Sequence, residues 1–169
     1  MNKKVLLTLA MITILACNFL FPPARSEQVV TSSELELKGI TIVRLRPEAG
    51  DLQTMLTEES QKATALGQIP VVEFDASWCP PCQAIEQSLG DKNELMLKAY
   101  DGTYIIKLDV DEWGWGDSDL HDFEFDGIPV YFKLDVKGKQ TGAVVDAGAW
   151  NENIPENMAP VMDKFFHGE

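Results

Sequence analysis

The sequence predicts an α/β domain with a mixed central sheet flanked by helices, in the order β-α-β-α-β-α-β-β-α. Runs rich in β-branched and aromatic residues alternate with segments whose apolar residues recur at helical spacing. Near the end, two such runs flank Lys137-Gly138-Lys139, which is typical of a β-hairpin. Strands joined through a helix usually run parallel, whereas a hairpin is antiparallel, so the sheet should be mixed.

The first half of the domain supplies two strands and two helices. Residues 40–45 are rich in β-branched side chains, which predicts the first strand. Asp51 is a good N-cap for a helix with one apolar face, which should end at Gly67. Residues 69–74 are typical of a buried strand. A second helix follows with Pro81 in its first turn, where proline is tolerated.

The second half contains three strands. Residues 104–110 predict one strand, and a loop with a short helical piece over 118–125 should follow it. Residues 129–134 and 141–146 then form the two strands of the hairpin.

The last helix is indicated by apolar residues at helical spacing between Met158 and Phe166. Asn153 and Glu156 are placed as a capping box at its start. Pro160 conflicts with a helix that runs straight through, so we expect the helix to kink there or to start near Ala159.

Composition sets the domain organisation. Residues 1–26 are interpreted as a signal sequence, 27–38 as a polar linker and 39–169 as one domain of ordinary size, expected to be a monomer. A hydrophobic content of 45% suffices for a packed core. The net charge of −13 argues against nucleic-acid binding, which needs Lys and Arg to neutralise phosphates.

The N-terminus is typical of an export signal, with Asn2-Lys3-Lys4 ahead of the apolar residues 5–15. Cys17 ends a segment that resembles a bacterial lipobox, which predicts lipidation of Cys17. Two alternatives remain: ordinary cleavage at Ala24-Arg25-Ser26, or retention of residues 5–21 as a membrane anchor at the short limit for a span. All three place the domain outside the cytoplasm, in a bacterial cell envelope, with the N-terminus as its only membrane contact.

Cys79 and Cys82 form a C-x-x-C pair where the second strand gives way to a helix. The spacing suits disulfide exchange, because the outer thiol can attack while the inner one resolves the mixed disulfide. In a βαβ-like setting this pattern indicates redox chemistry. A disulfide that closes so small a loop constrains the unfolded chain little, so a purely structural role explains it poorly.

A metal site is the chemical alternative. Zinc normally takes four ligands, but the sequence has no second cysteine pair beside Cys79 and Cys82, and its only histidines are His121 and His167. We therefore expect no metal and no diffusible cofactor, because a dithiol carries two electrons itself.

Four motifs in order resemble the thioredoxin family over residues 40–166. They are Glu73-Phe74 ahead of Trp78-Cys79-Pro80-Pro81-Cys82, then Lys107-Leu108-Asp109-Val110-Asp111, Gly127-Ile128-Pro129 and Gly148-Ala149. The resemblance implies a thioredoxin fold and a thiol–disulfide oxidoreductase whose partners are protein disulfides or dithiols.

The resemblance assigns roles to the dithiol and to two charged residues. Cys79 is the nucleophile, at a helix N-terminus where the dipole and the first-turn N–H groups favour a thiolate. Cys82, more buried, resolves the mixed disulfide. Glu73 is the buried acid that shuttles the proton of Cys82, and Lys107 pairs with it. Alternatively, Glu73 is a carboxylate at the end of a strand, exposed to water. Lys107 could likewise be on a half-exposed strand by coincidence, with no role in the site.

The resemblance also implies how a substrate docks. Pro129, if its peptide bond is cis, brings the backbone of Ile128 beside the dithiol, where a substrate strand could pair. An ordinary trans proline is the alternative. Trp78 is expected to cover one side of the active site, with core packing as the alternative.

Some residues depart from the family pattern. Pro80 replaces a usual glycine, which removes an amide donor and should shift the reduction potential. Asp75 replaces a usual tryptophan; near Cys79 it would oppose thiolate formation, but we expect it to point to solvent. Trp113 and Trp115 either line a substrate groove or cap the core.

The predicted function is that of an extracytoplasmic thiol–disulfide oxidoreductase that reduces disulfides in exported proteins. The reducing direction is favoured because Glu73 and Ile128 are thioredoxin-like, and it requires a membrane-bound redox partner as electron donor. The alternatives are a disulfide-forming oxidase or isomerase, and a non-catalytic binding or chaperone module with the same fold.

Overall fold

The computed structural model describes residues 39–114 and 122–168. Cys17, the predicted signal and linker, Trp115 and His121 therefore lie outside the described residues. The strands are β1 (Thr41–Arg44), β2 (Ile69–Asp75), β3 (Thr103–Asp109), β4 (Val130–Leu134) and β5 (Gln140–Asp146). The α-helices are α1 (Leu52–Ala65), α2 (Pro80–Gly90), α3 (Glu94–Tyr100), α4 (Val110–Trp113) and α5 (Pro155–His167), and 3-10 turns span Pro47–Ala49 and Ala147–Ala149.

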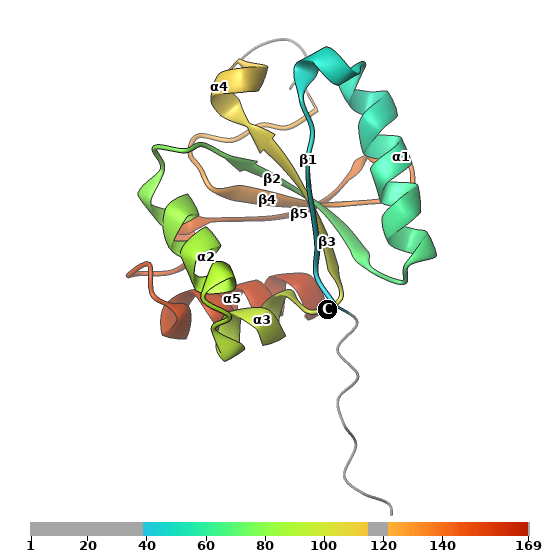
Figure 1. Ribbon diagram of the computed structural model, residues 1–169. Coiled ribbons are helices and arrows are strands. Elements are labelled where there is room, and N and C mark those ends of the chain that lie inside the picture. Colours follow the sequence, from blue (N-terminus) through green and yellow to red (C-terminus); the bar gives the residue numbers. More distant parts are fainter. Residues whose placement is uncertain (1–38, 115–121, 169) are drawn as a thin grey trace, which may run out of the picture. The chain divides into compact units, whose positions relative to one another are not determined.

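The strands form one mixed sheet in the order β1-β3-β2-β4-β5 (Figure 1). β1 and β2 lie parallel to β3, whereas β4 is antiparallel to both β2 and β5. The predicted mixed sheet is thereby confirmed. Its register places Glu73 of β2 between Lys107 of β3 and Tyr131 of β4, so three polar side chains cross the middle of the sheet.

Helices cover both faces of the sheet, α1 on one side and α2, α3 and α5 on the other (Figure 1). Successive residues of β2 alternate between the two apolar layers. Val72 and Phe74 pack in the layer that contains α1, whereas Val71 packs with Ile85 of α2. Glu73 is two residues after Val71, so its side chain lies on the same face of the sheet, the one that α2 covers.

Helix α1 begins as predicted, because Oδ1 of Asp51 accepts a hydrogen bond of 2.8 Å from the N–H of Thr54. The β4–β5 turn packs directly on this helix. Gly138 has a φ of +71°, and a Cβ there would lie 2.6 Å from the backbone carbon of Leu56 and the backbone nitrogen of Thr57. The close approach therefore requires glycine at the tip of the hairpin.

The segment between β2 and β4 differs from the prediction. Helix α3 was not predicted, although Asn93 caps it by accepting hydrogen bonds from two backbone N–H groups. The helical piece predicted over 118–125 is wrong where it can be seen, because residues 122–125 are not helical. A short helix instead follows β3 directly, at Val110–Trp113. Strand β4 then runs antiparallel to β2.

The start of α5 also differs from the prediction. The helix begins at Pro155, after Ile154, which makes no side-chain capping bond. The predicted capping box is wrong, because Oδ1 of Asn153 instead accepts a 2.9 Å hydrogen bond from Nε1 of Trp150. The predicted start near Ala159 is wrong too, since Pro160 lies inside the helix.

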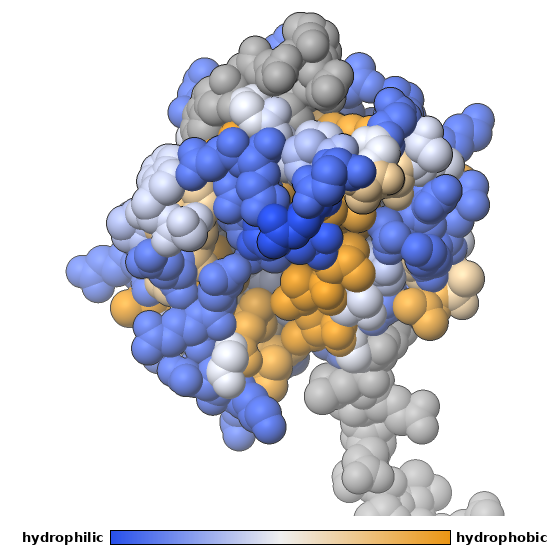
Figure 2. Space-filling view, turned by 45° about the horizontal axis from the view of Figure 1, so that its top comes forward, coloured by the Kyte–Doolittle hydropathy of each residue, from blue (hydrophilic) through white to orange (hydrophobic). Residues whose placement is uncertain are grey.

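Charged and polar residues dominate the surface. Figure 2 shows hydrophilic side chains over much of one face, with a hydrophobic area among them. Among the described helices, none has the length and apolar character needed to cross a membrane.

Candidate active site

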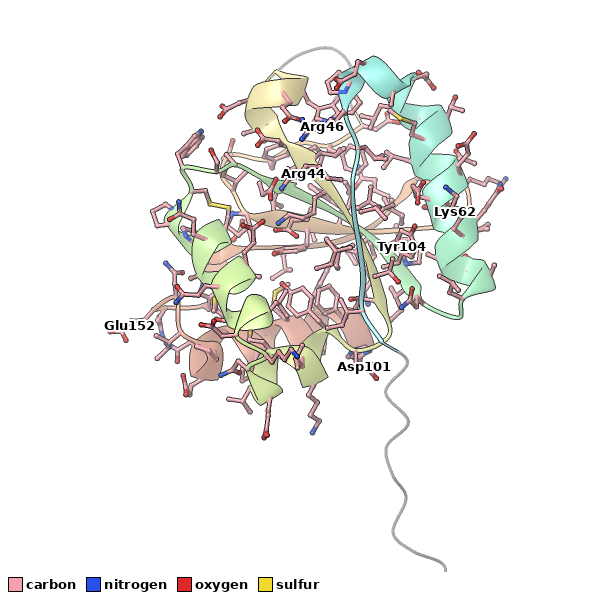
Figure 3. All side chains as sticks on the ribbon, in the orientation of Figure 1. Arg44, Arg46, Lys62, Asp101, Tyr104 and Glu152 are labelled. Carbon is pink, nitrogen blue, oxygen red and sulfur yellow. A yellow bond between two sulfur atoms is a disulfide. The ribbon has the colours of Figure 1, made fainter. Side chains whose placement is uncertain are left out.

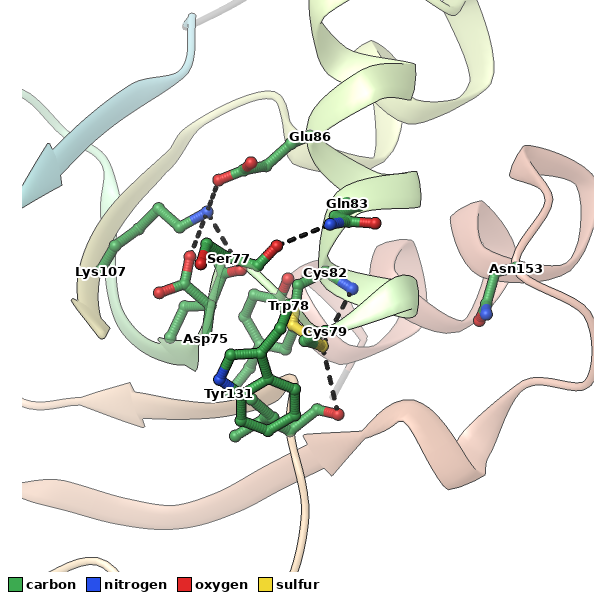
Figure 4. Close-up of a disulfide and its surroundings, with 12 residues drawn as sticks. Asp75, Ser77, Trp78, Cys79, Cys82, Gln83, Glu86, Lys107, Tyr131 and Asn153 are labelled. Carbon is green, nitrogen blue, oxygen red and sulfur yellow. Dashed lines mark hydrogen bonds and ion pairs between the residues drawn. A yellow bond between two sulfur atoms is a disulfide. The ribbon is translucent and has the colours of Figure 1, made fainter. Parts of the chain in front are cut away.

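Cys79 and Cys82 are joined by a disulfide with an S–S distance of 2.03 Å (Figure 4). Strand β2 ends at Asp75, and a short turn leads to Cys79, which is the N-cap of α2. Each cysteine is 1% exposed, so the expected greater burial of Cys82 is not seen. The structure therefore holds the predicted pair in its oxidised form, at the N-terminus of a helix.

The first turn of α2 offers little hydrogen bonding to the outer sulfur. The N–H of Cys82 donates to Sγ of Cys79 over 3.2 Å. Residues 80 and 81 are both proline and have no N–H to donate. After reduction, that amide and the positive end of the helix dipole would favour a thiolate on Cys79.

The loop before β4 lies against the disulfide. The Ile128–Pro129 peptide bond is cis, as the resemblance implied. The carbonyl oxygen of Ile128 lies 3.6 Å from Sγ of Cys79, and the carbonyl of Pro129 accepts a hydrogen bond from Ala147. The backbone of this loop therefore lies beside the dithiol.

The two described tryptophans after the second and third strands differ in burial. Trp78 is 57% exposed, and its Nε1 donates a 2.7 Å hydrogen bond to Oδ2 of Asp111. Core packing is therefore the wrong alternative for Trp78. Trp113 is 6% exposed and donates to the carbonyl oxygen of Leu45. Of the two interpretations offered for Trp113, the structure supports the core cap.

Glu73 is buried, which excludes the alternative of a carboxylate in water. Its Oε1 lies 3.5 Å from Nζ of Lys107 and has no hydrogen-bond partner within the described residues. Burial raises the pKa of Glu73 to about 7, and the charge of Asp75 adds to this, while Lys107 and the hydroxyl of Tyr131 oppose it. Glu73 can therefore hold or release a proton near neutral pH.

Lys107 contacts three carboxylates (Figure 4). Its Nζ lies 2.5 Å from Oε1 of Glu86 and 2.7 Å from Oδ2 of Asp75, both closer than Glu73. Burial lowers the pKa of Lys107, but the attraction of these carboxylates outweighs it, so the net pKa is raised. The lysine stays charged, and Glu73 is the most distant of its three partners.

Asp75 does not point to solvent, so that expectation is wrong. It is buried, and its two oxygens accept hydrogen bonds of 2.9 and 2.8 Å from the guanidinium of Arg44. Arg44 lies on the α2 side of β1, whereas Tyr104 lies on the α1 side (Figure 3). A basic residue in the first strand was the sequence signal for this pair, because an acid within a buried strand needs a partner.

The described residues contain no group of three or more potential ligands arranged to hold a metal ion. The Cys79–Cys82 pair lies beside the backbone of Ile128, and the buried acid Glu73 lies on strand β2, which leads to the pair.

Comparisons with known proteins agree with this arrangement. The family model "Thioredoxin" matches residues 53–160. The chloroplastic thioredoxin-like protein HCF164 of Arabidopsis thaliana is 28% identical over 144 residues, which cover 85% of this chain and 47% of HCF164. Thioredoxin H4 of Arabidopsis thaliana is 31% identical over 100 residues, which cover 58% of this chain and 75% of thioredoxin H4.

Among solved structures, the reduced thioredoxin preprotein of Schistosoma mansoni aligns with a TM-score of 0.45 at 21% identity, over 74% of this chain and 98% of that one. The alignment with HCF164 spans less than half of that relative. The match to the family model covers more than half of this chain, and a C-x-x-C disulfide lies at the N-terminus of α2. The chain therefore belongs to the thioredoxin family.

Proposed function

We propose that this protein reduces disulfides in exported proteins, outside the cytoplasm and in a bacterial cell envelope. The observation that carries the proposal is the Cys79–Cys82 disulfide at the N-terminus of α2, flanked by an exposed Trp78 and by the backbone of Ile128. An exposed aromatic side chain and a backbone beside the dithiol suit a polypeptide substrate, which can pair along its main chain.

The reducing direction is supported by the surroundings of the outer sulfur. Strong disulfide oxidants owe their high potential to a stabilised reduced form. Here the first turn of α2 offers Cys79 one amide, that of Cys82, because residues 80 and 81 are proline. A thiolate with so few donors is weakly stabilised, which favours a low reduction potential and a reductase.

The proposed reaction proceeds through a mixed disulfide between Cys79 and the substrate. The thiolate of Cys79 attacks one sulfur of the substrate disulfide, and the other substrate sulfur leaves as a thiolate. Glu73 takes the proton of Cys82, whose thiolate then attacks Sγ of Cys79 and releases the second substrate sulfur. The substrate gains two electrons as the Cys79–Cys82 disulfide forms. Its two sulfurs leave as thiolates and take up one proton from Glu73, which had it from Cys82, and one from water. A membrane-bound redox partner would return the electrons.

The location rests on the N-terminal sequence. The export signal and the lipobox-like segment at Cys17 support lipidation and anchoring of a monomeric domain. Expression in a bacterial host with radiolabelled palmitate should label the wild-type protein and leave Cys17→Ser unlabelled. If neither form is labelled and the mass of the mature protein corresponds to a chain that begins after residue 26, the cleaved alternative is supported instead.

The reduction potential of the Cys79–Cys82 pair tests the direction. Equilibration against dithiothreitol buffers should give a value near about −270 mV, whereas a value near about −120 mV would contradict the reductase. Cys79→Ser separates exchange from binding. This variant should no longer catalyse the reduction of insulin by dithiothreitol. If the protein only binds its clients, the variant should still suppress their aggregation as the wild type does.

A further inference from the structure

The ammonium of Lys107 is shared unequally among three carboxylates. Oε1 of Glu86 and Oδ2 of Asp75 lie at 2.5 and 2.7 Å, within hydrogen-bond distance. Oε1 of Glu73 lies at 3.5 Å and has no hydrogen-bond partner within the described residues. Glu73 is therefore the one carboxylate of this group that Lys107 does not hydrogen-bond.

Asp75 is held in the position that causes this. Its carboxylate accepts two nearly parallel hydrogen bonds from Arg44, which fix its plane as well as its place. Asp75 and Glu73 are two residues apart on β2, so both lie on the face that α2 covers. Lys107, on the neighbouring strand, lies opposite Glu73 in register but leans toward Asp75 and Glu86.

We propose that Asp75 is a positioning residue for disulfide exchange: by holding Lys107 together with Glu86, it keeps the ammonium from hydrogen-bonding Glu73, which therefore carries the exchangeable proton. This inference rests on the exchange role proposed for Glu73. Asp75 touches neither the dithiol nor the substrate in the reaction proposed above.

Every element packed around Glu73 adds to its environment. Lys107 comes from β3, and the hydroxyl of Tyr131 comes from β4 and is itself bonded to Tyr100 of α3 over 3.2 Å. Helix α2 contributes Glu86, and β1 contributes Arg44, which lies 3.9 Å from both Glu86 and Asp109. Among these charged groups, Asp75 both repels a charge on Glu73 and diverts the nearest cation from it.

Two consequences of removing the charge of Asp75 therefore have the same sign. Lys107 would be free to approach Glu73, and a neighbouring negative charge would be lost. Both favour the ionised form, so the pKa of Glu73 should fall from about 7. The prediction is thus a lower pKa of Glu73, which a merely structural role for Asp75 would not produce.

The test compares Asp75→Asn with Asp109→Asn in the full chain. Asp109→Asn is the matched control, because it removes a carboxylate beside Arg44 that does not touch Lys107. The readouts are the titration of the Glu73 carboxyl followed by ¹³C NMR and the pH dependence of insulin reduction. Glu73→Gln, which lacks this carboxyl, identifies the signal and the pH midpoint that belong to Glu73. We expect Asp75→Asn to lower both midpoints by one unit or more, about tenfold in proton affinity, and Asp109→Asn to leave them unchanged.

Equal shifts in the two variants, or no shift in Asp75→Asn, would overturn the inference. If Asp75→Asn does not fold, Glu86→Gln replaces it, because Glu86 is half exposed and its loss frees one bond of Lys107. A smaller shift of the same sign is then expected, and no shift overturns the inference. If the wild-type protein does not reduce insulin, the proposed function fails, but the NMR titration still decides this inference.

Discussion

The amide of Cys82 donates a 3.2 Å hydrogen bond to the sulfur of Cys79, across a first helical turn that contains two prolines. An N-cap side chain normally accepts from the second or third helical residue, and the second one here is Pro81. Pro81→Ala would add an amide that can reach the sulfur. It should stabilise the thiolate of Cys79 and thereby the reduced form.

The reduction potential of Pro81→Ala should rise by about 30 mV, the equivalent of about 1.4 kcal/mol, which is the size expected of one hydrogen bond to a charged group. The thiolate absorbance at 240 nm should titrate at a lower pH. Pro80→Ala is the control, since the first helical N–H does not point at the cap, and it should change the potential less. A potential that falls in Pro81→Ala would contradict the argument.

The fold was largely predictable because its signals are local. The hairpin around Gly138 and the cap at Asp51 each depend on residues close in sequence, and both were found. The helix predicted over 118–125 was wrong over residues 122–125, which are not helical. The capping box at Asn153 was wrong because its Oδ1 accepts a hydrogen bond from Trp150 instead. Helix α3, which is seven residues long, gave too short a pattern for its periodicity to be recognised.

The site was predicted where its motifs are contiguous and missed where partners lie far apart in the sequence. The Cys79–Cys82 pair is a contiguous motif, and so is the Ile128–Pro129 cis bond. The pairing of Asp75 with Arg44 joins residues 31 positions apart. No local pattern shows which of three carboxylates Lys107 contacts most closely, since that depends on how α2 packs on the sheet.

Glu73 should make the oxidised protein less stable at higher pH. Its pKa is about 7 in the folded protein and 4.5 when free, so the folded state binds this proton more tightly. Its contribution is fully present below about pH 4.5 and is lost as the pH rises through 7. The shift corresponds to an upper bound of about 3 kcal/mol in the free energy of unfolding.

Urea unfolding at pH 5 and pH 8 should therefore show a loss of stability in the wild type that Glu73→Gln lacks. Glu48→Gln, at an exposed position in the 3-10 turn Pro47–Ala49, should retain the wild-type pH dependence. Parallel pH dependence in wild type and Glu73→Gln would show that another group causes the loss.

Lys107→Met should destabilise the protein strongly, because it leaves the buried carboxylates of Asp75 and Glu73 without their ammonium. Breaking a buried ion pair from one side typically costs about 3–5 kcal/mol. The cost should be smaller at pH 5, where Glu73 is protonated. Lys139→Met is the surface control, since its partner Asp122 is 60% exposed, and should cost about 1 kcal/mol or less. Equal losses in the two variants would contradict burial as the cause.

The tryptophans Trp78 and Trp113 should separate substrate binding from stability. Trp78→Ala removes a 57% exposed side chain, so the free energy of unfolding should change by about 0.5 kcal/mol or less. Its kcat/KM for insulin should fall about tenfold, because tryptophans at protein contacts often contribute more than 1 kcal/mol, while reaction with a small disulfide stays unchanged. Trp113→Ala should instead cost about 3–5 kcal/mol of stability, since Trp113 packs in the core. If Trp78→Ala slowed both substrates equally, the indole would act on the dithiol and not on docking.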